Sequence, residues 1–322
     1  MLTIELLNSC AQFAAFDQEG HCALRAPGLY ALARMKAKTK DLQTFVQAYD
    51  LQLQASPVWE AWPAGEAWGH ALGQRSAWPK YRDMFFQWLA YEGAGRVLTQ
   101  ALPRLTLSCG AAGFDGLLRT AYAVEARHHH ELADALALWA CCWQERAPLA
   151  AAPTGAGSDA RRVLRQLPRI NIHGGDWVHA MQIAADTPLL LRAAATLQTS
   201  TDTLEQLAGL AAQAYACTAN PAAHTLVTSA DALRRLLPCM DEPEPALRSY
   251  WQDFAATVAV AGLQLGTAPA ALPWPELLRL ARASRDVRTI TLVDCCHHLA
   301  LAYGRDGWWQ SAATRAVQAM NA

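Results

Sequence analysis

Apolar residues recur every three or four positions along most of the chain, and the stretch 113–139 shows the pattern best. The apolar positions there are Leu117, Leu118, Ala121 and Val124, then Leu132, Ala135, Leu136 and Trp139. This spacing is typical of helices with one buried face. The polar segment 127–131, which reads RHHHE, separates the two runs. The pattern therefore predicts two packed helices that fold back as a helical hairpin.

The same period continues elsewhere, interrupted by segments rich in Pro and Gly. We expect further helices at 2–13, 27–35, 41–53, 81–98, 161–167, 177–184, 187–197, 202–216, 221–237, 246–265, 276–283, 289–303 and 308–320. The segment 57–79, rich in Trp, Pro and Gly, is expected to be a long loop. No stretch with β-branched residues shows the sustained alternation of apolar and polar positions that marks a half-buried strand. The chain is therefore predicted to be all-α, one large multi-helix domain of packed helical hairpins.

The segment 147–158 is enriched in Ala, Pro, Gly and Ser, and we interpret it as an internal linker. It separates an N-terminal helical half, 1–146, from a C-terminal helical half, 159–322. A length of 322 residues suits either one large helical domain or two packed halves. We expect the two halves to form one domain.

Composition excludes some classes of partner. The chain has 27 Lys and Arg against 28 Asp and Glu, and this balance argues against a nucleic-acid partner or an anionic membrane surface. No membrane span and no signal peptide is predicted, because no apolar run is long enough and the first residues lack a basic segment. The nine cysteines lack zinc-site spacing and are expected to be reduced thiols in a cytoplasmic protein.

Candidate chemistry begins on the first helix of the hairpin. Asp115, Arg119 and Tyr122 follow one another at intervals of four and three residues and can share one helix face. Asp115 and Arg119 are expected to form an ion pair across one helical turn. Such a polar cluster on an apolar helix is either a structural bridge or the remains of a site. No G-x-S-x-G, G-x-G-x-x-G or P-loop motif offers another site.

Two segments of the hairpin, FDGLLRTAYA (114–123) and ELADALALWA (131–140), resemble the questin oxidase-like family. In that family a segment of the form H-G-x-I-R-T-x-H-A precedes E-L-A-x-x-L-A-x-W-A. Similar stretches follow at 224–238, HTLVTSADALRRLLP, and at 294–297, DCCH. The resemblance runs from about Ala23 to Ala313.

The resemblance implies a single metal, non-haem iron, held by histidines from separate helices. It also implies oxygen chemistry on an aromatic, polyketide-type small molecule. The positions that match the family's histidines are Arg25, Asp115, Tyr122, Thr225 and His297, and the family's lysine falls on Ala300. Of these, His297 alone is still a histidine, while His224 lies one residue before the matched position.

Two functions follow from the resemblance, and as a whole it favours the first. The first is an oxidoreductase with an altered metal site, in which Asp115, Arg119 and Tyr122 are catalytic and His297 and His224 bind the metal. The second is a non-catalytic member that binds a small apolar or acidic ligand in the former active-site cavity. Arg25 and Thr225 would contact this ligand, and Arg25 and Arg119 would orient its acidic group. Arg25 would then replace the metal as the local cation and pair with Asp115. A plainer interpretation makes His297 a core histidine. The sequence does not indicate an oligomeric state.

Overall fold

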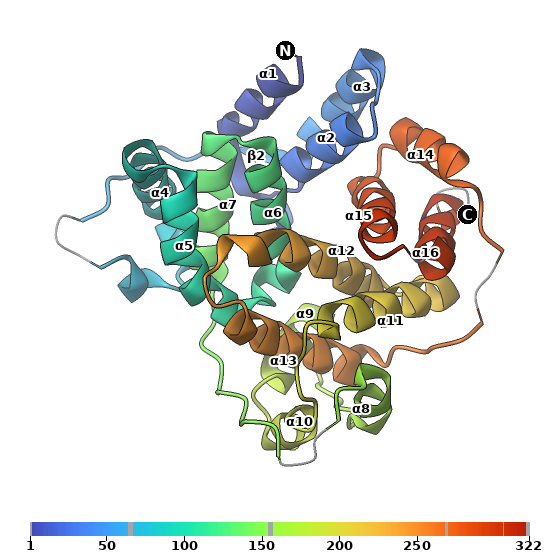
Figure 1. The fold of residues 1–322 in the computed structure, drawn as a ribbon. Coiled ribbons are helices and arrows are strands. Elements are labelled where there is room, and N and C mark those ends of the chain that lie inside the picture. Colours follow the sequence, from blue (N-terminus) through green and yellow to red (C-terminus); the bar gives the residue numbers. More distant parts are fainter. Residues whose placement is uncertain (1, 64–66, 154–156, 268–269, 305, 320–322) are drawn as a thin grey trace.

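The computed structural model describes residues 2–63, 67–153, 157–267, 270–304 and 306–319. This part of the chain forms sixteen α-helices and one two-stranded sheet, so the all-α prediction is confirmed (Figure 1). The helices of the first half are α1 (Leu2–Asn8), α2 (Arg25–Arg34), α3 (Thr39–Asp50), α4 (Trp78–Glu92), α5 (Ala94–Leu105), α6 (Asp115–Ala126) and α7 (His129–Cys142). Those of the second half are α8 (Ala160–Gln166), α9 (Trp177–Ala184), α10 (Pro188–Ala194), α11 (Thr203–Thr218), α12 (Pro221–Leu236), α13 (Glu244–Ala261), α14 (Trp274–Ala283), α15 (Val287–Tyr303) and α16 (Asp306–Ala319).

The two strands, β1 (Phe13–Asp17) and β2 (Leu53–Ala55), are antiparallel and place Phe13 opposite Ala55. The prediction that the chain has no strands is wrong here. Each strand is short, and neither shows the alternation of apolar and polar residues that marks a half-buried strand. Helix α1 also ends at Asn8, well before the predicted end at Phe13.

The predicted hairpin is present as α6 and α7, which pack against each other. Its hinge is shorter than expected. Arg127 adopts a left-handed conformation with φ 52°, and His128 caps α7 by accepting a hydrogen bond of 3.1 Å from the Glu131 amide to its Nδ1. His129 and His130 already belong to the first turn of α7.

The single helix predicted at 81–98 is two helices, α4 and α5, because Gly93 between them has φ 80°. A positive φ of this kind carries no steric penalty for glycine. Helix α5 then continues through Pro103 to Leu105.

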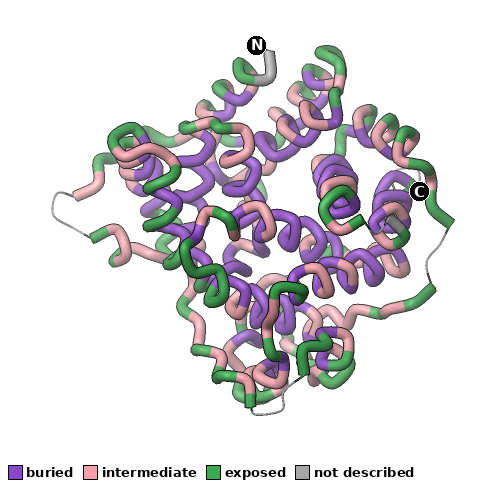
Figure 2. Tube along the Cα trace, viewed as in Figure 1, coloured by how far each residue is buried: buried purple, intermediate pink, exposed green. Residues whose placement is uncertain are grey.

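Four helices form a closed ring of contacts, in which α2 and α12 each contact both α6 and α15. Two of these helices come from each half, and one hydrophobic core runs through both halves (Figure 2). The beginning of the predicted linker is also held in place, since the Ala147 amide donates to Asp186 Oδ1 at 2.8 Å and Gln252 Nε2 donates to the Ala147 carbonyl at 3.0 Å. Linker residues 154–156 lie outside the described residues.

Across the described ranges, no helix is both long enough and apolar enough to cross a lipid bilayer.

Candidate functional site

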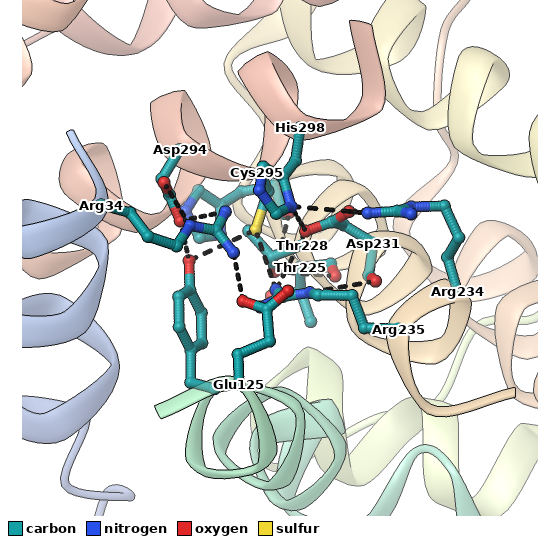
Figure 3. Close-up of polar contacts among 12 residues, drawn as sticks. Arg34, Glu125, Thr225, Thr228, Asp231, Arg234, Arg235, Asp294, Cys295 and His298 are labelled. Carbon is teal, nitrogen blue, oxygen red and sulfur yellow. Dashed lines mark hydrogen bonds and ion pairs between the residues drawn. The ribbon is translucent and has the colours of Figure 1, made fainter. Parts of the chain in front are cut away.

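A network of buried and half-buried charged side chains lies at the centre of the ring formed by α2, α6, α12 and α15 (Figure 3). It contains three arginines and three carboxylates: Arg34, Arg234, Arg235, Glu125, Asp231 and Asp294. The formal charges cancel, which is what allows so many ionised groups to leave water together. The four helices that carry the family-matched positions Arg25, Asp115, Tyr122, Thr225 and His297 are the ones that build this ring.

Tyr122 lies inside this network, between two guanidinium groups. The Cζ atoms of Arg34 and Arg235 are 5.7 Å and 4.4 Å from the centre of its ring. Its hydroxyl donates to Asp294 Oδ2 at 2.6 Å. Burial raises the pKa of Tyr122 well above its usual value, and it raises the pKa of Asp294 to about 6. The phenol is therefore neutral and acts as a hydrogen-bond donor to the carboxylate.

Glu125 and Asp231 connect the remaining helices. Glu125 Oε2 accepts from Nη1 of Arg34 on α2 and, at 3.1 Å, from Nη1 of Arg235 on α12. Arg235 Nη2 also lies 2.9 Å from Asp231 Oδ2. Burial alone would raise the pKa of Asp231, but Arg235 and Arg234 outweigh it and hold that pKa below its usual value. Asp231 is therefore ionised, and its charge is compensated within its own helix.

The network reaches the surface at Arg234 and His298, whose side chains are each 27% exposed. Arg234 Nη2 lies 2.9 Å from Asp231 Oδ1 and 3.4 Å from His298 Nδ1. Burial lowers the pKa of His298 to about 4, so its imidazole is neutral near pH 7. His298, the neighbour of the predicted residue His297, is the histidine that joins the network.

Arg25 is not the cation at this centre. Its Nε lies 2.5 Å from Asp50 Oδ1, and its Nη1 donates to the Leu6 carbonyl at 2.9 Å. The predicted pairing of Arg25 with Asp115 is therefore wrong, because Asp50 of α3 takes the guanidinium instead. Arg34, on the same helix, about two and a half turns further along, supplies the positive charge at the centre. The predicted role of Arg25 in ligand binding has no contact that supports it.

The predicted ion pair between Asp115 and Arg119 is also wrong. Arg119 Nε lies 2.5 Å from Glu131 Oε1, and its Nη2 lies 3.7 Å from Asp134 Oδ2. Glu131 and Asp134 are both buried on α7 and face α6. A buried carboxylate without a cation beside it costs more free energy than a half-buried one such as Asp115, so Arg119 pairs with the buried carboxylates. Asp115 instead forms a hydrogen bond with Cys22, and burial raises its pKa to about 7. Asp115, Arg119 and Tyr122 therefore contact three different parts of the protein.

The remaining predicted residues also lie apart. The ring of His297 packs edge-on against Trp274 of α14, with ring centres 5.0 Å apart. The Thr225 hydroxyl donates to the Pro221 carbonyl of its own helix at 3.3 Å. His297 and His298 differ in this way because successive residues of a helix point about 100° apart.

These positions do not fit the non-haem iron that the resemblance implies. An iron that activates oxygen requires several nitrogen or carboxylate donors that converge on one point. Within the described ranges, no group of three or more His, Cys, Asp or Glu residues could hold a metal ion. His297 lies against α14, while His224 bonds to the backbone of Arg288. We therefore assign no metal to the centre of the ring.

A cavity of about 360 Å³ lies beside His224, between α11, α12, α16 and the beginning of α15. Its wall includes Tyr215, His224, Asp286, Arg288, Thr289 and Ala316. His224 Nε2 lies 2.9 Å from the Arg288 carbonyl oxygen. A carbonyl oxygen only accepts, so Nε2 carries the hydrogen and Nδ1 is an acceptor. Burial lowers the pKa of His224 to about 4, which keeps the ring neutral near pH 7.

Asp286 and Arg288, the two charged residues that line the cavity, differ in the bonds they form within the protein. Asp286 caps α15 and accepts from the Thr289 amide at 2.9 Å and from the Thr289 hydroxyl at 2.6 Å. The Arg288 side chain is exposed and forms no ion pair with any described residue. The cavity wall therefore contains an exposed guanidinium that forms no ion pair with a described residue, and a neutral imidazole, beside apolar side chains. The family-like segment 224–238 pointed to His224, but no local pattern distinguishes Arg288 or Tyr215 from ordinary helix residues.

Comparison of the chain with protein-family models and with curated proteins found no match in either set, so membership of the questin oxidase-like family stays a prediction.

Proposed function

We propose that this protein binds a small hydroxylated aromatic carboxylate in the cavity beside His224. The observation that supports this most is that the cavity wall holds both Arg288, an exposed guanidinium without an ion pair to a described residue, and His224, a neutral imidazole. The proposal keeps the second function that the resemblance implies, ligand binding without redox chemistry. It moves the site from the centre of the helix ring to the cavity at the beginning of α12 and α15.

The chemistry of the cavity selects this class of ligand. Its volume of about 360 Å³ falls in the range of small-molecule pockets and suits one or two fused rings. A carboxylate can pair with the Arg288 guanidinium in a charge-assisted hydrogen bond. A hydroxyl can donate to His224 Nδ1, and the aromatic ring can pack against buried Tyr215, whose ring centre lies 5.9 Å from that of His224.

We propose no oxygen chemistry for this protein. The centre of the ring is occupied by paired charges, and its cations are the guanidinium groups of Arg34 and Arg235. An oxidoreductase of the implied class would need iron donors there, and the side chains at the matched positions point to separate partners. The proposed function therefore requires binding and orientation alone.

Isothermal titration calorimetry with three probes tests the proposal: 6-hydroxy-2-naphthoate, 2-naphthoate and 2-naphthol. We expect the hydroxynaphthoate to bind most tightly. Each probe that lacks one polar group should bind about tenfold more weakly, because one hydrogen bond to a charged or buried group is worth about 1.4 kcal/mol.

Arg288→Ala should lower the affinity for both carboxylates about tenfold and leave 2-naphthol unchanged. Arg285→Ala is the matched control, since Arg285 is exposed, precedes α15 by two residues and is not among the residues that line the cavity. The proposal is wrong if no probe gives a binding heat at millimolar concentration. It is also wrong if Arg288→Ala binds both carboxylates as tightly as the unmodified protein does.

A further inference from the structure

A second cavity, of about 430 Å³, lies where the two halves of the chain meet, and the proposed function does not use it. Its wall is formed by the end of α5 with the turn after it, the segment that follows α7, and the first part of α13. Three arginines line it, one from each of these elements: Arg104, Arg146 and Arg248. Two glutamates, Glu145 and Glu244, line it as well, so the cavity wall carries one more positive than negative charge.

Arg146 has a buried donor without a partner. Its side chain is 6% exposed. Nε donates to Asp253 Oδ1 at 3.0 Å, and Nη1 donates to the Gln182 carbonyl at 3.2 Å and lies 3.5 Å from Asp186 Oδ2. Nη2, in contrast, forms no hydrogen bond with a described residue. Since a buried donor without an acceptor costs free energy, an anion held against Arg146 stabilises this guanidinium.

Arg248 and Ser249 bring a second cation and a hydroxyl from α13. Arg248 Nη2 donates at 2.8 Å to both the Leu149 and the Ala150 carbonyl, and Nε lies 3.8 Å from Glu244 Oε1. Its Nη1 forms no hydrogen bond with a described residue. Ser249 is half-buried, and its hydroxyl also forms no hydrogen bond with the described part of the chain. Both groups are therefore available to a ligand in the cavity.

The beginning of α13 adds the positive end of a helix of 18 residues. Glu244 and Pro245 of its first turn line the cavity, and no described side chain caps its first amides. Free amides at the beginning of a helix attract anions, and here they act beside guanidinium groups. The Glu244 side chain opposes this effect, but it is 60% exposed and water screens its charge.

Arg104 supplies the third guanidinium, and Trp143 supplies an aromatic surface. The Cζ atom of Arg104, an exposed residue, lies 5.0 Å from the centre of the Trp143 ring. The Trp143 indole also donates to the Arg104 carbonyl at 3.1 Å. Leu107 and Leu149 add apolar side chains to the same wall. The cavity therefore offers apolar surface next to its cations.

We propose that this cavity binds an aromatic phosphate monoester. Its donors come from three separate elements, an arrangement that suits the three oxygens of a tetrahedral phosphate better than the two oxygens of a planar carboxylate. Arginine and a helix N-terminus are the groups that most often bind phosphate. A volume of about 430 Å³ is that of a small-molecule pocket and leaves room for a ring against Trp143.

The cavity is preformed, because the segment after α7 is held on both sides. Arg248 binds the carbonyls of residues 149 and 150, and Gln252 Nε2 donates to the carbonyls of Ala147 and Ala185 at 3.0 Å each. The Ala147 amide donates to Asp186 at 2.8 Å. A ligand therefore binds without first ordering this part of the wall.

Isothermal titration calorimetry at pH 8, where a phosphate monoester is a dianion, tests the proposal with the full-length protein. The probes are 1-naphthyl phosphate, 1-naphthoate, inorganic phosphate and 1-naphthol. We expect 1-naphthyl phosphate to bind most tightly. Inorganic phosphate, which lacks the ring, and 1-naphthoate, which lacks one oxygen and one charge, should each bind about tenfold more weakly, and 1-naphthol should bind weakest.

Two mild substitutions locate the binding site. Arg104→Gln should weaken 1-naphthyl phosphate about tenfold through the loss of one charge-assisted hydrogen bond, and Ser249→Ala should weaken it about fivefold. Arg96→Gln is the matched control, because Arg96 is exposed on the same helix as Arg104 and is not among the residues that line the cavity.

An aromatic anion can also enter the cavity beside His224, so Arg288→Ala is measured in parallel. The proposal is overturned if 1-naphthyl phosphate gives no binding heat at millimolar concentration, or if 1-naphthoate binds as tightly. It is equally overturned if Arg288→Ala lowers the affinity for 1-naphthyl phosphate while Arg104→Gln and Ser249→Ala leave it unchanged.

Discussion

The Tyr122 hydroxyl and Asp294 Oδ2 lie 2.6 Å apart, and this hydrogen bond joins α6 to α15 in the middle of the protein. The resemblance matched Tyr122 to a metal-binding histidine. In the structure the charges that surround it are guanidinium groups and carboxylates instead. Asp294 is buried and ionised near neutral pH. Each hydrogen bond that its carboxylate accepts therefore replaces a hydrogen bond to water that is lost on burial.

Replacing Tyr122 by Phe should lower the free energy of unfolding by about 1–3 kcal/mol, the usual cost of leaving a buried acceptor without one donor. Urea unfolding followed by circular dichroism measures this loss. Tyr91→Phe is the matched control, because Tyr91 is 90% exposed. Equal stability of the two variants would show that the hydroxyl does not support Asp294.

Arg235→Met should be more damaging, with a loss of about 3–5 kcal/mol, because it leaves buried Asp231 and part-buried Glu125 without their shared cation. The double variant Arg235→Met/Asp231→Leu should recover part of this loss, since it removes a cation and a buried anion together. Arg96→Met, at an exposed position on α5, is the control. If the losses in the free energy of unfolding of Arg235→Met and Asp231→Leu simply add in the double variant, Arg235 and Asp231 are not coupled.

Most helices were predicted well because the apolar residues of a buried helix face recur every three or four positions in the sequence. The hairpin of α6 and α7 is the best example: buried Leu117, Leu136 and Trp139 all follow the helical period. Strands β1 and β2 were missed because three to five residues are too few to show a period.

The partners of the charged residues could not be predicted in the same way. Arg34 and Asp294 are 260 positions apart in the chain, and each taken alone looks like a residue of a solvated helix face. Local spacing favoured the pair Asp115 and Arg119, but tertiary packing gave Arg119 to Glu131. Only the arrangement of the helices decides which of several possible ion pairs forms.

His224 makes the stability of the protein depend on pH. Its pKa falls from 6.5 to about 4 on folding because it is buried. The neutral ring therefore contributes stability that is fully present above pH 6.5 and is lost as the pH falls towards 4. Between pH 7.5 and pH 5 this loss amounts to about 2 kcal/mol. Asp294, with its pKa raised to about 6, acts with the opposite sign, since its contribution is present at low pH and is lost as the pH rises through 6.

Comparison with His224→Gln isolates this contribution from the opposing carboxylates. Urea unfolding at pH 7.5 and pH 5 measures the free energy of unfolding of both proteins. From pH 7.5 to pH 5, the unmodified protein should lose about 2 kcal/mol more of this free energy than the variant does. His21→Gln, at a side chain that is 63% exposed, should change with pH as the unmodified protein does. The same pH dependence in all three proteins would contradict a buried neutral His224.

His224 should also decide which ligands the cavity prefers. In His224→Phe the acceptor Nδ1 is gone, so 6-hydroxy-2-naphthoate should lose about tenfold in affinity and bind no better than 2-naphthoate, whose affinity should stay nearly unchanged. Because the imidazole is already neutral at pH 7, raising the pH from 7 to 8 should not alter this preference. Thr225→Val, a change one residue away whose hydroxyl bonds to its own helix, is the control. Calorimetry on the two variants gives the answer directly: if His224→Phe still prefers the hydroxylated probe, the hydroxyl binds elsewhere and the proposed orientation of the ligand is wrong.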